Sequence, residues 1–212
     1  MNRTAPGIAA VVTALLLGLT GCGSDAGAAV RPAEVPKPSV APVKSPLAGL
    51  AVLPRGYIAD PKSAPGPFTA TSFLAEHSAD PALDRALLLN AGFVEGYRAS
   101  RLSPDKKQRY VVQLFKAATP AKAKTLQEGR WYQTARKHPF RVPGALSDTQ
   151  SGYDGSHGRN EAVAEASFVV GSLVAELSVH GSAPLGTDVR PDTALITALA
   201  AQQQARLTSK SG

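Results

Sequence analysis

The chain has 212 residues, and its 23 lysine and arginine residues outnumber its 16 aspartate and glutamate residues, which gives a formal net charge of +7. Without a leader and a linker, this length leaves room for one domain of about 150 residues, which can bury a core without disulfides. The single cysteine excludes an intrachain disulfide framework and a cysteine-based metal or redox centre.

The first 22 residues have the three parts of a secretory signal. Arg3 supplies a positive charge, an apolar run extends from Ile8 to Leu19, and the small residue Gly21 precedes Cys22. The run is shorter than the roughly 20 apolar residues that a membrane-spanning helix needs. We therefore predict a signal peptide at 1–21.

The residues Leu19-Thr20-Gly21-Cys22 resemble the lipobox of bacterial lipoproteins. This resemblance implies that diacylglycerol is attached to Cys22, which becomes the new N-terminus on the extracytoplasmic face of the cell membrane. Two or more acyl chains would give stable attachment, whereas one chain gives only marginal binding. A plain secretory signal that happens to contain a cysteine is the alternative.

Residues 22–54 are predicted to be a tether. This segment is rich in alanine and in regularly spaced prolines, and such a composition favours extended polyproline conformations over a packed core. The prolines are Pro32, Pro36, Pro38, Pro42 and Pro46.

The predicted domain spans 55–207 and begins with a helical region that is interrupted at Asp80-Pro81. Asp80 is expected to cap a helix, Pro81 to take its first position, and Gly92 to end it. Two strands at 93–102 and 110–117 follow, and Thr119-Pro120 starts another helix.

The clearest pattern lies in the second half of the domain. Two runs, 162–170 and 173–179, alternate between apolar and polar residues around Gly171-Ser172, so a hairpin would place Phe168 opposite Ala175. The glycine- and proline-rich stretch 139–158 is predicted to be loop with at most a short strand. A final helix starts at 192 or 193, and 208–212 are predicted to form a disordered tail.

Two hairpins separated by helices predict the α+β class, with an antiparallel sheet and helices packed on one face. Catalytic signals are poor, because the four histidines show no metal-ligand spacing and no nucleophile motif appears. Ser156-His157 suggests a nucleophile and base, yet adjacent residues seldom form such a pair. We predict no catalytic residue, no metal and no cofactor.

Positive charge is concentrated between Arg98 and Arg141, where twelve basic residues face only Asp105 and Glu128. Such a segment can contact anionic lipid headgroups or wall polymers, or its charges pair across the fold. Nucleic acid is not an expected partner outside a cell, and the sequence does not indicate which protein would be a partner. The candidate contact residues are Lys106, Lys107, Arg109, Arg130, Arg136, Lys137 and Arg141.

The anchor, tether and domain together resemble small actinobacterial envelope lipoproteins, and the order of elements is weakly similar to extracellular sensor-type domains. The resemblance implies a membrane-anchored, non-enzymatic ligand-binding, sensor or accessory domain of the envelope. Two alternatives are left open: an envelope hydrolase with a dispersed active site that uses His157 or His180, and a structural subunit of an envelope complex.

Overall fold

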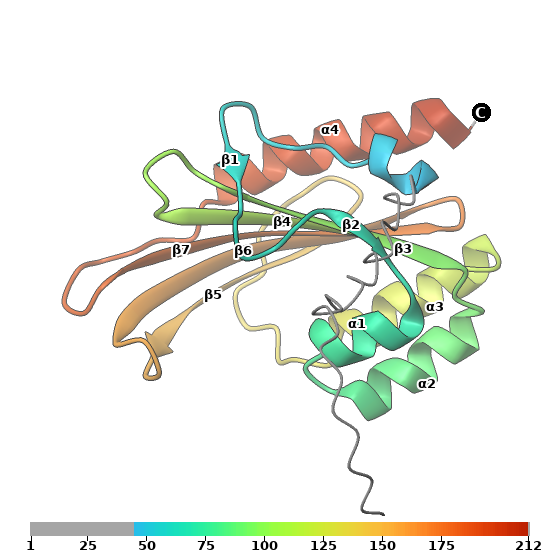
Figure 1. Ribbon diagram of the computed structural model, residues 1–212, viewed down its shortest axis with the longest axis horizontal. Helices are drawn as coiled ribbons and strands as arrows, with labels where there is room; N and C mark the ends of the chain where they lie inside the picture. The colour runs from blue at the N-terminus through green and yellow to red at the C-terminus, as the bar shows by residue number, and fades with distance from the viewer. Residues whose placement is uncertain (1–44, 212) are drawn as a thin grey trace, which may run out of the picture. The chain divides into compact units, whose positions relative to one another are not determined.

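The structure of the protein is a computed structural model in which residues 45–211 are described. The predicted signal peptide, Cys22 and most of the predicted tether lie outside the described residues. Within 45–211 the chain forms four α-helices, a short 3-10 helix and one seven-stranded sheet (Figure 1).

The strand order is β1-β3-β4-β7-β6-β5, with β2 also paired to β3, and every pair is antiparallel. The predicted α+β class, with an antiparallel sheet that contains two hairpins, is confirmed. The elements are η1 (Pro46–Gly49), β1 (Ile58–Ala59), β2 (Gly66–Phe68), α1 (Ala70–Glu76), α2 (Pro81–Ala91), β3 (Glu95–Leu102), β4 (Gln108–Lys116), α3 (Pro120–Trp131), β5 (Leu146–Asp154), β6 (Arg159–Val170), β7 (Leu173–Pro184) and α4 (Thr193–Ser211).

The β6–β7 hairpin has the predicted register, since Phe168 lies opposite Ala175 and Ala164 opposite Val179. Gly171 has a φ of 57°, whereas Ser172 does not have a positive φ. A positive φ at only the first of two turn residues is typical of a type II′ turn, whose twist matches that of the strands.

The helix ends also form as predicted. Asp80 accepts a hydrogen bond from the backbone N–H of Leu83 at 3.0 Å, Pro81 takes the first position of α2, and Gly92 ends that helix with a φ of 57°. Thr119 caps α3 in the same way through the N–H of Lys122. These caps satisfy N–H groups that a helix start leaves without partners.

The helices lie on both faces of the sheet, which corrects the prediction that they pack on one face (Figure 1). Leu114 of β4 and Ala175 of β7 point to the first face, which α4 covers. Their neighbours Phe115 and Val174 point to the second face, where α1, α2 and α3 pack. The polar residues on the outer face of the β6–β7 hairpin favour a sheet with one face open to solvent. Apolar residues at one end of that same face, however, also need to be buried beneath helices.

Strand β5 corrects the prediction of a loop with at most a short strand at 139–158. It pairs with β6 along its whole length, from Leu146 opposite Ser167 to Asp154 opposite Arg159. As an edge strand with mostly exposed residues, β5 lacks the apolar alternation that marks a buried strand.

The packed region is longer at both ends than 55–207. Leu47 and Val52 are buried against the first face, and the side chain of the fully buried Gln203 bonds to the backbone of Val52 at 2.7 Å and of Leu50 at 2.8 Å. Helix α4 continues to Ser211, through the stretch that the sequence analysis assigned to a tail.

Candidate functional site

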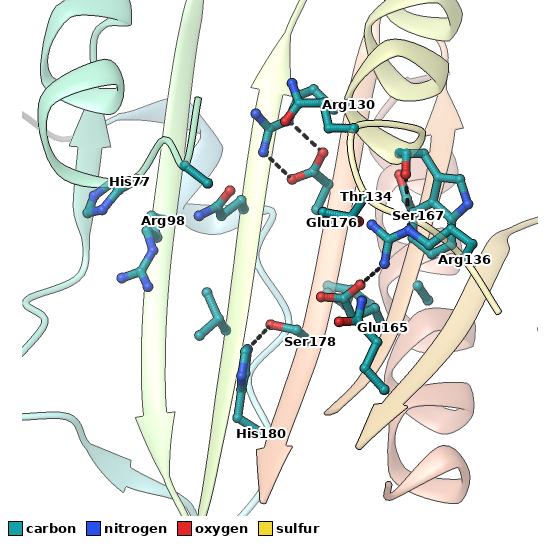
Figure 2. A pocket seen from close by; sticks show the side chains of 18 of the residues that line it. His77, Arg98, Arg130, Thr134, Arg136, Glu165, Ser167, Glu176, Ser178 and His180 are labelled. Carbon is teal, nitrogen blue, oxygen red and sulfur yellow. Dashed lines mark hydrogen bonds and ion pairs between the residues drawn. The ribbon is translucent and has the colours of Figure 1, made fainter. Parts of the chain in front are cut away.

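The candidate site is a cavity of about 470 Å³ on the second face of the sheet. Helices α1–α3 cover one end of this face through the aromatic cluster of Phe68, Phe73, Phe93 and Phe115. The cavity lies beside this cluster, over strands β3, β4, β7 and β6, and Figure 2 shows the polar side chains that line it.

The register of the sheet brings distant polar residues together. Paired residues on neighbouring strands share a face, so Arg98, Gln113, Glu176 and Ser167 form one row across β3, β4, β7 and β6. The next row contains Ser178 and Glu165, and the row after it places His180 beside Arg109.

Arg130 of α3 forms the wall between the cavity and the aromatic cluster. Its guanidinium donates to both carboxylate oxygens of Glu176, at 2.8 and 2.9 Å, and to Asp84 of α2 at 2.7 Å. Burial alone would lower the pKa of Arg130, but the two carboxylates raise it above its usual range. Arg130 is therefore a fixed and neutralised cation that also stacks over Phe73 and Phe115.

Arg136 also lines the cavity and is neutralised in a similar way. Its guanidinium pairs with Glu165 of β6 and lies 3.9 Å from the ring centroid of Trp131. Its Nε also donates to the carbonyl of Trp131 at 3.0 Å. A stacked and paired arginine of this kind has a defined position rather than a free charge.

Arg98 differs from these two arginines. Its Nη1 donates to Ser63 Oγ, its Nε is buried without a hydrogen-bond partner, and it makes no ion pair within the described part of the chain. Burial is the largest cause that lowers the pKa of Arg98, followed by the nearby charge of Arg109, while Asp60 opposes both.

The buried carboxylate of Asp60, in the segment between β1 and β2, is already satisfied. It accepts hydrogen bonds from Ser100 Oγ at 2.7 Å and from the backbone N–H of Lys62 at 3.0 Å, and Arg109 Nε lies 3.1 Å away. Burial raises the pKa of Asp60, but these hydrogen bonds and the nearby arginines together lower it below its usual value. Asp60 therefore stays ionised.

His180, one of the two histidines named in the hydrolase alternative, lines the cavity. Its Nε2 shares a hydrogen bond of 2.9 Å with Ser178 Oγ (Figure 2). Burial lowers the pKa of His180, and the charges of Arg109 and Arg98 lower it further. The ring is accordingly neutral at pH 7.

The seven candidate residues of the basic segment do not all lie together. Lys106 and Lys107 are exposed in the β3–β4 turn, and Lys137 and Arg141 are exposed between α3 and β5. Arg109, Arg130 and Arg136 lie on the second face and are paired with Asp60, with Asp84 and Glu176, and with Glu165. Contact between this set and an anionic surface stays a prediction.

The sequence pair Ser156-His157 lies in the exposed β5–β6 turn. Ser156 Oγ and Asp154 Oδ2 both contact the same nitrogen of His157, Nδ1, at 3.0 and 2.5 Å. A relay needs the serine and the carboxylate on opposite ring nitrogens, so these three residues do not form one. Within residues 45–211 no three histidine, cysteine, aspartate or glutamate side chains gather as a metal site.

Comparison with known proteins gives little guidance. No protein-family model matches the chain, and no curated protein sequence matches it. Among solved structures, the extracellular domain of PknH from Mycobacterium tuberculosis aligns with a TM-score of 0.41 and 12% identity, over 73% of this chain and 80% of that chain. Similarity at that level carries no argument about function.

Proposed function

We propose that this protein is a membrane-anchored, extracytoplasmic and non-enzymatic binding domain that holds a small polar molecule in the cavity on the second face. The observation that carries the proposal is a hollow lined by polar side chains that other groups hold in place. Its volume of about 470 Å³ falls within the roughly 300–1,000 Å³ that is usual for small-molecule sites.

The fixed side chains favour binding because they need little reorganisation. Arg130 and Arg136 are both held by carboxylates and aromatic rings at the edge of the cavity. A preorganised site loses less side-chain entropy when it binds a ligand. The space between the sheet and helices α1–α3 is filled by the aromatic cluster, whereas the cavity beside that cluster is open.

The location rests on the lipobox. Lipid on Cys22 would place the domain at the outer surface of the membrane, and no helix within residues 45–211 is long and apolar enough to cross a bilayer. The exposed side chains of Lys106, Lys107, Lys137 and Arg141 would then meet anionic headgroups or wall polymers nearby.

The hydrolase alternative is supported by one contact and opposed by its surroundings. Ser178 and His180 share a hydrogen bond, as a nucleophile and its base would. However, no carboxylate within the described residues bonds to His180. Both residues lie in the interior strand β7, whose backbone N–H groups pair with β4 and β6 rather than form an oxyanion hole.

The binding function can be tested by native mass spectrometry of the full-length protein, purified from membranes in detergent and screened against a library of small metabolites. Ser178→Phe places a ring in the cavity, and Ser151→Phe is a matched control at an exposed position of β5. Wild type and Ser151→Phe should retain a ligand mass that Ser178→Phe loses, with both variants folded by circular dichroism. A ligand retained by Ser178→Phe, or none bound by wild type, would contradict the proposal.

A further inference from the structure

We propose that the ligand of this cavity carries an oxyanion, a carboxylate or a phosphate, on a sugar-sized hydroxylated body, and that the guanidinium of Arg98 binds that oxyanion. This inference rests on the proposed function and adds the ligand class and the recognition residue.

Charges around the cavity do not cancel on the β3 side. Arg130 faces two carboxylates, Asp84 and Glu176, so this cluster carries one net negative charge, and Arg136 is matched by Glu165. Near β3, Arg98 and Arg109 face the single carboxylate of Asp60, and His180 is neutral. One positive charge is therefore left over beside β3, apart from the negative charge around Arg130, and an anionic group would be complementary to it there.

The excess charge belongs to Arg98 because Asp60 is engaged elsewhere. Ser100 and the backbone N–H of Lys62 already donate to that carboxylate, and Arg109 forms an ion pair with it, whereas Arg98 donates one hydrogen bond, to Ser63. A half-buried guanidinium with unused donors is costly to leave unpaired. The forked donors of arginine also fit a carboxylate or a phosphate.

The rest of the lining fits a hydroxylated body. Gln113, Gln150, Thr134 and Ser178 offer neutral donors and acceptors to the cavity, and Trp131 lines it beneath the guanidinium of Arg136. Figure 2 shows Arg98 and His180 on one side of the hollow, with Arg136 and Glu165 across from them. An anionic head at Arg98 would leave the hydroxyl groups of a sugar beside these neutral side chains.

Proton uptake should accompany the binding of such an anion. The charges that act on His180 are those of Arg98 of β3 and Arg109 of β4. Glu165 of β6 lies opposite Ser178, the hydrogen-bond partner of His180, and Asp60 forms an ion pair with Arg109. A bound oxyanion offsets the two arginine charges and so raises the depressed pKa of His180. Affinity for a carboxylate should therefore increase as pH falls from 8 to 6.

The test is isothermal calorimetry of the full-length protein in detergent with glucuronate, glucose 6-phosphate and neutral glucose. At least one acid should bind at least tenfold more tightly than glucose, and Arg98→Gln should remove that difference. Arg101→Gln removes the same charge from the opposite face of β3 and should leave binding unchanged. Arg98→Lys should bind the acid with intermediate affinity, and thermal unfolding should show that each variant is folded.

Equal binding of glucose and both acids, unchanged binding by Arg98→Gln, or no binding of either acid would overturn this inference. The proposed binding function can be refuted independently of this inference about the ligand. A neutral ligand that Ser178→Phe displaces would refute the oxyanion while the cavity keeps its binding role. If no compound of the metabolite library binds, both proposals fail. The glucuronate and glucose 6-phosphate titrations distinguish a carboxylate from a phosphate.

Discussion

Arg130 connects three elements through one guanidinium. It lies on α3, and its two carboxylate partners lie on α2 and β7, 46 residues away in either direction along the chain. Only 13% of the Arg130 side chain and 2% of the Asp84 side chain are exposed. Water therefore has little access to these groups and cannot take the place of the hydrogen bonds between them. The ion cluster is thus a fixed part of the wall of the cavity.

Arg130→Met should therefore destabilise the fold strongly. The substitution keeps most of the apolar volume but leaves Asp84 and Glu176 without their cation, and removing one partner of a buried ion pair costs about 3–5 kcal/mol. The free energy of unfolding in urea measures the loss. Lys124→Met is the control, because Lys124 and Glu128 form an exposed pair and such pairs contribute only about 0.2–0.5 kcal/mol. Equal effects of the two substitutions would show that burial does not strengthen the Arg130 contacts.

For single residues, the sequence shows which side chains are charged but not which of them form ion pairs with one another. The basic segment from Arg98 to Arg141 contains all three arginines that line the cavity. Their partners come from other parts of the chain, and the special position of Arg98 depends on which neighbours already occupy Asp60. To predict these ion pairs, one must know the register of β3 and β4 and the position of α2. A count of charges along the sequence gives neither.

Among the elements, the β6–β7 hairpin was predicted with its register because one face of it is buried. A shift by one residue would have moved Ala164, Phe168 and Val179 to the polar face. Strand β5 and the segment around η1 could not be predicted in this way. The former is a mostly exposed edge strand, and the latter is a proline-rich stretch that packs through a few buried residues such as Leu47.

The turn of this hairpin gives a prediction that concerns backbone conformation alone. Gly171 has a left-handed φ, and a Cβ built on it would contact nothing within 4 Å. Gly171→Ala should therefore lower the free energy of unfolding by about 1–3 kcal/mol, the cost of a sparsely populated positive-φ conformation for a residue with a side chain. Gly152→Ala in β5 also adds a methyl group in open space but at an ordinary φ. If chemical denaturation gave Gly152→Ala the same loss, backbone strain would not be the cause.

Considered as a whole, the domain is covered unequally on its two faces. On the first face, α4 and the segment around η1 pack against the sheet, whereas α1–α3 protect only the aromatic end of the second. The rest of the second face carries polar rows that need no cover, and these rows form the cavity. The unequal cover of the two faces therefore leaves a polar region of the sheet open, and this region forms the candidate site.

The proposed attachment of the whole molecule to a membrane would depend on Cys22, which lies outside the described residues. In an actinobacterial host fed an alkyne-labelled fatty acid, the wild-type protein should become labelled and its mature form should begin at Cys22, because the thiol is the nucleophile that takes the lipid. Cys22→Ser should lose the label completely, while Ser24→Ala, two residues away, should keep it. Mass spectrometry of the N-terminal peptide measures both the start and the added lipid. A labelled Cys22→Ser protein, or a wild-type chain that begins elsewhere without lipid, would refute the lipid anchor and leave the binding cavity on a secreted domain.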